Sequence, residues 1–118
     1  MDLPEKEKFI FGSLFLLANR LQAIGDRWDP EITMKQWFLI VMTAHWGETP
    51  PMLSELADFI GSSRQNVKQL ALKLEAKGFL KIEKDPKDNR ALRIMLTDQC
   101  IEHFEKREDR DQLFLDEV

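Results

Sequence analysis

Basic side chains gather in one part of this 118-residue chain, between residues 62 and 93. That window holds nine basic and four acidic residues, a net charge of +5, and the rest of the chain holds eight basic and 17 acidic residues, a net charge of −9. Such a window attracts a polyanion, because neutralising its phosphates releases bound counterions. Charge alone is equally compatible with a solvated basic surface that has no partner.

Polar side chains occupy one face of the helix predicted over residues 62–78. At about 100° per residue, Gln65 and Gln69 lie opposite the inward apolar stripe. The stripe consists of Val67, Leu70, Ala71 and Leu74. Lys68 lies on one shoulder of this outer face and Asn66, Lys73 and Ser62 lie on the other, whereas Arg64 lies nearer the inward edge at the first turn. Gln and Asn can pair with adenine and Arg with guanine, so this face is a candidate DNA-reading surface, the alternative being an ordinary solvated face.

A charged turn follows this helix. Apolar and charged residues alternate on both sides of residues 85–90, a segment dense in turn formers, and predict a β-hairpin between residues 80 and 96. At or near its tip, Lys87, Arg90 and Arg93 suit contacts with phosphates or with the minor groove, where narrow grooves concentrate negative potential.

Two acidic residues, Asp85 and Asp88, stand beside these cations and would be repelled by DNA unless they are paired. We expect Asp88 to pair with Arg90 or Arg64 and so to hold the loop in a shape that aims the arginine. The alternative is that these residues serve turn geometry alone.

The helix over residues 62–78 is preceded by a shorter helix that begins at Thr49-Pro50-Pro51 and is closed by Gly61. Ser62 and Gln65 match a capping box at the start of the longer helix. A turn containing glycine between a short and a longer helix is typical of the helix-turn-helix, and the hairpin directly after it indicates a winged helix-turn-helix.

Further helices flank this unit. The first, over residues 5–25, ends in glycine, and a connector over residues 26–32 leads to a largely buried helix that opens with a capping box of Thr33 and Gln36. The last, capped by Thr97-Asp98, is predicted over residues 98–118. The order predicts a mainly α-helical winged helix-turn-helix with a small β-hairpin wing and flanking helices, in one domain over residues 1–118.

The helix over residues 5–25 is apolar around much of its circumference, because Phe9, Ile10, Leu16 and Leu17 widen its stripe beyond one face. Such a helix needs cover on more than one side. In a chain of this length a second copy of the protein is the expected cover.

Several short motifs occur together in this chain. They are Glu55-Leu56-Ala57, the Gly61-Ser62-Ser63 turn, Leu74-Glu75-x-Lys77-Gly78-Phe79-Leu80, Asp85-Pro86-x-Asp88-x-Arg90 and Ile94-x-Leu96-Thr97. From about Thr33 to Thr97 the chain resembles the MarR family of bacterial and archaeal transcription regulators. The Asp-x-Arg wing followed by Leu-Thr is fairly specific among winged helices.

The resemblance implies a homodimer built from the N- and C-terminal helices that binds a pseudo-palindromic site in double-stranded DNA, one recognition helix per half-site, with repression favoured over activation. It implies that residues 63–69 read bases and that Arg90 is the wing-tip arginine, with Asp88 as its partner. The predicted DNA-binding residues are therefore Ser62, Ser63, Arg64, Gln65, Asn66, Lys68, Gln69, Lys73, Lys87, Asp88, Arg90 and Arg93.

The resemblance also implies control by a small, often aromatic, ligand lodged between the dimer interface and the DNA-binding lobe, without a cofactor. Candidate pocket residues are Phe11, Phe15, Trp37 and Val41, for which core packing is the alternative. The chain stops sooner after Thr97 than family members usually do. Either dimerisation rests mainly on the helix over residues 5–25, or this is a shortened version of the fold.

The second hypothesis is a winged-helix adaptor that binds another protein and not DNA. A protein-binding face more often carries an aromatic anchor, and Trp28, Trp37 and Trp46 all lie outside the basic window. No metal site is expected, because His45 and His103 are far apart in sequence, and no arrangement of residues predicts an enzyme.

Cys100 is interpreted as a small apolar residue, since its nearest charged neighbours are acidic and would not lower a thiol pKa. No apolar run approaches the roughly 20 residues of a membrane span, and the first residues are not the basic start of a signal peptide. The expected location is the cytoplasm.

Overall fold

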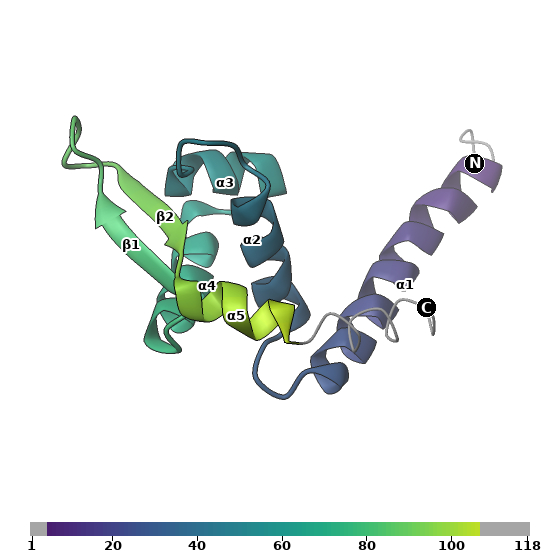
Figure 1. Ribbon diagram of the computed structural model, residues 1–118. Coiled ribbons are helices and arrows are strands. Elements are labelled where there is room, and N and C mark those ends of the chain that lie inside the picture. Colours follow the sequence, from purple (N-terminus) through teal and green to yellow (C-terminus); the bar gives the residue numbers. More distant parts are fainter. Residues whose placement is uncertain (1–4, 107–118) are drawn as a thin grey trace.

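The computed structural model describes residues 5–106 and forms a winged helix-turn-helix, as the sequence predicts (Figure 1). Its elements are α1 (Glu5–Trp28), α2 (Met34–Ala44), α3 (Leu53–Ile60), α4 (Arg64–Ala76), β1 (Leu80–Lys84), β2 (Leu92–Leu96) and α5 (Asp98–Glu105). The predicted helix over residues 98–118 is thus described only as far as α5, and residues 107–118 lie outside the described part.

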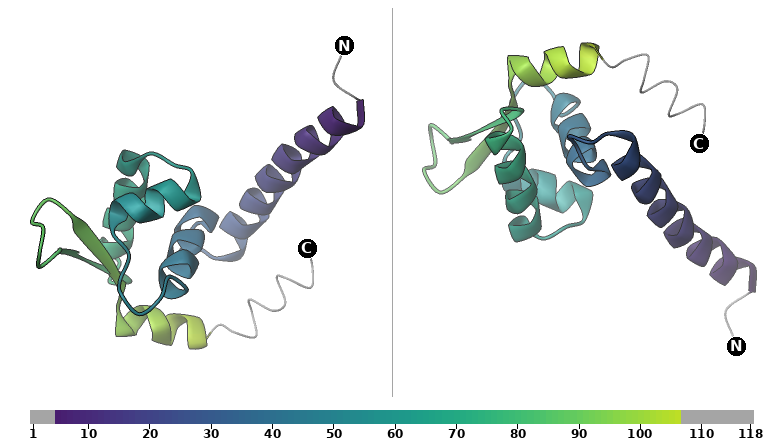
Figure 2. Two further views of the ribbon diagram at one scale, coloured as in Figure 1. Left: turned by 90° about the horizontal axis from the view of Figure 1, so that it is seen from above. Right: turned by 90° about the horizontal axis from the view of Figure 1, so that it is seen from below.

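Two regions make up the molecule. Elements α2 to α5 surround a single core, whereas α1 leaves this lobe as a long arm (Figures 1 and 2). Leu39, Leu56, Leu74 and Ile94 are completely buried at the centre of the core, so that α2, α3, α4 and β2 each contribute a large side chain. Within residues 5–106, none of the helices combines the length and apolar character that crossing a bilayer requires.

The arm continues past Gly25, where the sequence predicts its end. Gly25 is buried against the side chain of Met34, and a Cβ at this position would overlap it, so the glycine serves close packing and not helix termination. Asp26 lies in the last turn of α1, and its carboxylate accepts a hydrogen bond of 2.6 Å from the backbone N–H of Met34. The first residues of the predicted connector over residues 26–32 therefore belong to α1, and Asp26 holds the first N–H of α2.

The capping predictions have different outcomes. Thr33 and Gln36 form the predicted capping box at the start of α2. The second predicted box is wrong, because the N-cap of α4 is Ser63, whose hydroxyl accepts from the N–H of Asn66 at 3.1 Å. Gly61 closes α3 as predicted, in the left-handed conformation, and the N–H of Ser62 after it donates to the carbonyl of Ala57 at 3.0 Å.

The predicted start of the short helix at Thr49-Pro50-Pro51 is also wrong, since α3 begins at Leu53. The prolines lie in an extended segment beside β2, where the carbonyl of Pro51 accepts from the N–H of Ile94 at 3.0 Å. Met52 forms an isolated antiparallel bridge with Arg93. This connector therefore pairs with the root of the wing.

The wing is a two-stranded antiparallel hairpin in which Leu80 pairs with Leu96 and Lys84 with Leu92. Leu80 and Ile94 point into the core, so the alternating pattern of the sequence is confirmed. The predicted cap of the last helix is confirmed as well, because the hydroxyl of Thr97 accepts from the N–H of Cys100 at 3.1 Å.

Candidate nucleic-acid interface

The outer face of α4 is displayed to solvent because its inner face is buried. Val67, Ala71 and Leu74 have no exposed surface, and Leu70 packs against them, which confirms the predicted inward stripe. Outside this stripe, Arg64, Gln65, Asn66, Lys68, Gln69 and Lys73 of α4 are exposed, as is the N-cap Ser63, and Ser62 is half-buried just before it. The structure thus brings together, on α4 and the two residues that precede it, all eight residues predicted between positions 62 and 73.

The cations of this face are not neutralised by acidic side chains within residues 5–106. In the part of the chain that the structure describes, no salt bridge joins Arg64, Lys68 or Lys73 to an acidic side chain. Their charges are therefore available to an external anion, and phosphate is the anion that several cations on one helix face suit.

The wing tip is organised by Asp85. Its Oδ2 accepts hydrogen bonds from the N–H groups of Lys87 and Asp88, at 3.1 and 3.0 Å, and its Oδ1 accepts one from Nε of Arg93 at 2.8 Å. The hydrogen bond from Arg93 is the main reason that the pKa of Asp85 lies below its ordinary value of 3.8. A buried carboxylate with three donors fixes the turn in one shape.

Arg90 projects from this turn. Its Nε lies 3.6 Å from Oδ1 of Asp88, and its backbone N–H donates to the same oxygen at 3.0 Å. Asp88 therefore pairs with Arg90, which is one of its two expected partners. The Arg90 side chain is nevertheless 95% exposed. Lys87 is also exposed on this turn.

Arg93 differs from the other predicted DNA-binding cations. Its side chain is only 23% exposed, and its guanidinium is directed into the protein. Besides Asp85, it donates from Nη1 to the carbonyl of Pro50 at 2.6 Å and lies 3.9 Å from Oε1 of Glu55. Contact between Arg93 and DNA stays a prediction. The sequence did not predict the contacts that Arg93 makes inside the lobe.

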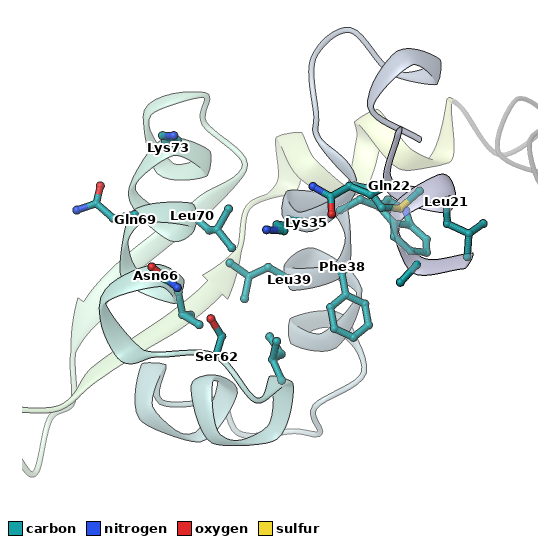
Figure 3. Close-up of a pocket in the computed structure, with 15 residues that line it drawn as sticks. Leu21, Gln22, Lys35, Phe38, Leu39, Ser62, Asn66, Gln69, Leu70 and Lys73 are labelled. Atoms are coloured by element: carbon teal, nitrogen blue, oxygen red, sulfur yellow. The ribbon is translucent and has the colours of Figure 1, made fainter. Parts of the chain in front are cut away.

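A pocket of about 890 Å³ lies between α1, α2 and α4 (Figure 3). Its apolar lining includes Leu21, Trp37 and Phe38, and Lys35 lines it as well. On the α4 side it is lined by the predicted DNA-binding residues Ser62, Asn66, Gln69 and Lys73. The pocket therefore borders the outer face of α4.

Of the four predicted pocket residues, Trp37 lines this pocket, whereas Phe11, Phe15 and Val41 lie outside its lining and their role stays a prediction. The expectation that the helix from residue 33 is largely buried is wrong for Trp37 and Phe38, which are 38% and 40% exposed. In α2 the lobe covers only the face that carries Gln36, Leu39, Ile40 and Thr43.

The arm exposes a run of large apolar side chains. Seven of them, each 52–76% exposed, are Phe9, Ile10, Phe11, Leu14, Phe15, Leu16 and Leu17. Phe11 and Phe15 pack edge to face on successive turns, with their ring centroids 5.2 Å apart. The lobe leaves this length of α1 uncovered.

The remaining candidate groups have ordinary structural surroundings. Within residues 5–106 no three His, Cys, Asp or Glu side chains are placed to hold a metal ion. His103 lies 3.6 Å from the carboxylate of Glu31 and stacks near Phe79. Cys100 is buried in the core, and this burial raises the pKa of its thiol to about 11, which keeps it protonated at neutral pH.

The match to a known family decides how this geometry is interpreted. A model of the MarR family matches residues 32–92, which is more than half of the chain. The chain belongs to the MarR family. It is therefore a DNA-binding transcriptional regulator, and its family is not one of enzymes. A search of curated protein sequences finds no match.

Solved structures of similar proteins share the fold. Sco3205 of Streptomyces coelicolor, solved in complex with DNA, is 22% identical, with a TM-score of 0.79 over 96% of this chain and 75% of its own. A MarR-like regulator of Bacillus cereus is 22% identical, with a TM-score of 0.79 over 97% and 82%. BpsR of Bordetella bronchiseptica, whose DNA binding is regulated by 6-hydroxynicotinic acid, is 20% identical, with a TM-score of 0.73 over 90% and 76%.

Sequence reasoning missed some contacts that position the site in this MarR-family chain. Lys77, at the end of α4, donates to the carbonyl of Glu31 and lies 3.4 Å from Oε1 of Gln36. Pro50 and Glu55 hold Arg93. Nothing in the local pattern marks these partners, because they are separated from the residue that they bind by 38 to 46 positions.

Proposed function

We propose that this MarR-family protein represses transcription by binding a pseudo-palindromic operator as a homodimer. In each protomer, α4 reads bases in the major groove and the wing contacts phosphates or the minor groove through Lys87 and Arg90. The observation that carries this proposal is the outer face of α4, where amide and basic side chains are exposed and the cations have no acidic partner within residues 5–106, opposite the buried Val67, Ala71 and Leu74.

Selection of bound duplexes from a random pool, at stated salt concentrations, tests base reading and symmetry together. The expected product is an inverted repeat whose half-sites are separated by about one helical turn or a multiple of it. A single unrepeated motif would contradict the dimeric, pseudo-palindromic mode. Recovery of no preferred duplex at low salt would favour the adaptor hypothesis.

The exposed arm supports the homodimer. Burial of each large apolar side chain contributes about 1.5–3 kcal/mol, so the uncovered face of α1 offers enough free energy to offset the cost of association. Leu14→Asp is expected to give monomers in light scattering, because it places a charge in that face. Asn19→Asp, on a polar side of the same helix, is the control and should leave the dimer intact; an unchanged mass for both variants would remove α1 from the interface.

The pocket beside α4 supports control by a small aromatic ligand. Trp37 and Phe38 offer aromatic surfaces there, and Asn66 and Gln69 line it from the proposed DNA-reading helix. The compound that regulates DNA binding by the similar BpsR, 6-hydroxynicotinic acid, is itself an aromatic acid. A panel of aromatic acids is titrated into the protein, and intrinsic fluorescence and operator binding are measured. We expect the panel to contain compounds that change both quantities.

Trp37→Ala is the matched variant for the ligand test, and it should abolish the response while preserving operator binding. Phe59→Ala, which removes an exposed aromatic side chain outside the pocket lining, should preserve the response. A response that survives Trp37→Ala unchanged would place the ligand elsewhere.

A further inference from the structure

Arg93 stands at an unusual place for a charged side chain. It precedes Ile94 on β2, so strand alternation directs it away from the core, yet its side chain is only 23% exposed. The cover is the extended connector before α3, because Met52 bridges Arg93 and the carbonyl of Pro51 accepts from the N–H of Ile94. The connector thus acts as a third, partial strand at the root of the wing.

The guanidinium of Arg93 joins three parts of the lobe. Nε donates to Asp85 in the wing turn at 2.8 Å, and Nη1 donates to the carbonyl of Pro50 in the connector at 2.6 Å. Nη1 also lies 3.9 Å from Oε1 of Glu55, in the first turn of α3. The same Glu55 oxygen accepts from the N–H of Met52 at 2.9 Å, so the carboxylate is itself held in place.

Two carboxylates neutralise this cation. Arg93 lies between Asp85 and Glu55, whereas Arg90 has one partner and is almost fully exposed. Arginine suits such a site because its planar fork presents several donors in fixed directions. A guanidinium engaged in this way has no surplus charge for a phosphate.

We propose that Arg93 is a positioning residue that locks the wing to α3, and that it does not contact DNA. Asp85 accepts from Arg93 and also from the N–H groups of Lys87 and Asp88. The lock is this set of contacts, which connects Glu55 of α3, through Arg93 and Asp85, to the wing tip. It fixes the direction from which Arg90 approaches DNA while α4 lies in the groove, so that the wing is ordered before binding. This inference rests on the proposed DNA contact of the wing.

Asp85→Asn gives the sharpest test, because charge alone and the proposed positioning role of Arg93 predict opposite changes in operator affinity. Removal of a negative charge near DNA should tighten binding if charge alone matters. Loss of the ion pair with Arg93 should instead weaken operator binding by about ten- to a hundredfold, the cost of one charge-assisted hydrogen bond. Glu83→Gln is the matched control, since it makes the same charge change on the same hairpin and should not weaken binding. Tighter binding by Asp85→Asn would overturn the proposal.

The salt dependence of operator binding separates positioning from phosphate contact. Arg93→Gln should lower affinity with the slope of log affinity against log salt unchanged, whereas Arg90→Gln should reduce the slope by about one per wing. Arg93→Lys should recover only part of the affinity, because an ammonium cannot reproduce the fork. A reduced slope for Arg93→Gln would assign Arg93 to a phosphate and overturn the lock.

Amide hydrogen exchange in free protein provides a readout that needs no DNA. The N–H groups of Lys87 and Asp88 should exchange faster in Arg93→Gln and Asp85→Asn than in wild type, while those in α4 stay protected. Unchanged exchange in both variants would overturn the lock even if DNA binding falls. Failure of wild type to bind any duplex would instead overturn the proposed function, and the exchange result would still report on the lock.

Discussion

The outer face of α4 and the wing tip both carry exposed cations, but they are held in place by different forces. The orientation of the α4 face is fixed by the opposite side of the helix, where Val67, Ala71 and Leu74 are completely buried. The wing turn over residues 85–90 has no buried apolar side chain, and polar contacts of Asp85 fix it instead. A regular helix can be oriented by nondirectional apolar packing, whereas a short turn needs directional bonds to reach one shape.

This difference explains the distribution of acidic residues. On α4 an acidic partner would only compete with the phosphates, and within the described residues Arg64, Lys68 and Lys73 have none. In the wing, Asp85 and Asp88 serve as acceptors that shape the turn, and their repulsion of DNA is offset by the cations that they hold.

The largest expected effect comes from removing the apolar support of α4. Leu74→Ala should lower the free energy of unfolding by about 2–5 kcal/mol, because it leaves a cavity at a fully buried position. Urea denaturation measures the change, and Leu72→Ala, at an exposed position of the same helix, should cost much less. If Asp85→Asn destabilised the protein as much as Leu74→Ala, the two regions would not differ as described.

Substitutions on the outer face of α4 should affect sequence preference. Gln65→Ala or Gln69→Ala should cost about 1–3 kcal/mol of discrimination at defined operator positions, because a bidentate pair with a base is lost. Affinity for random duplex should change little, and competition binding measures both quantities. An equal loss on operator and random DNA would show that these side chains do not read bases.

At the wing tip the expected effect is smaller and independent of sequence. Arg90→Ala should weaken binding to operator and random DNA alike and reduce the salt slope by about one per wing, the signature of one phosphate contact. Lys81→Ala removes a cation from the same hairpin that is already paired with Glu83, so it should have the weaker effect. A salt slope equal to that of wild type would contradict the assigned contact.

The smallest effect concerns the pH dependence of stability. The pKa of Asp85 is held below 3.8 by the hydrogen bond from Arg93, so the ionised form stabilises the fold above that pH and this stabilisation is lost as pH falls through the lowered pKa. The stability difference between wild type and Asp85→Asn should therefore shrink as acid is added below about pH 4, measured by denaturation at successive pH values. If the stability difference between wild type and Asp85→Asn did not change with pH, the charge of Asp85 would not contribute to stability.

Prediction from sequence succeeded where a signal is local. The stripe of α4, the alternation of β1 and β2 and the caps at Thr33 and Thr97 depend on residues within a few positions of one another. It failed where a residue had two uses. Gly25 has the type of a helix terminator but packs against Met34, and Pro50-Pro51 can start a helix but lie beside β2.

The amino-acid sequence by itself determined which elements form, which side of α4 faces outward and where positive charge is concentrated, because periodicity and composition act over short distances along the chain. Only the tertiary structure decided which of the described cations are exposed and which are directed into the protein. Arg90 and Arg93 are three positions apart and have the same chemistry, yet one is exposed and the other is held by Pro50, 43 residues away. Folding brings such distant acceptors next to Arg93, and a pattern among residues that are close in sequence cannot predict these contacts.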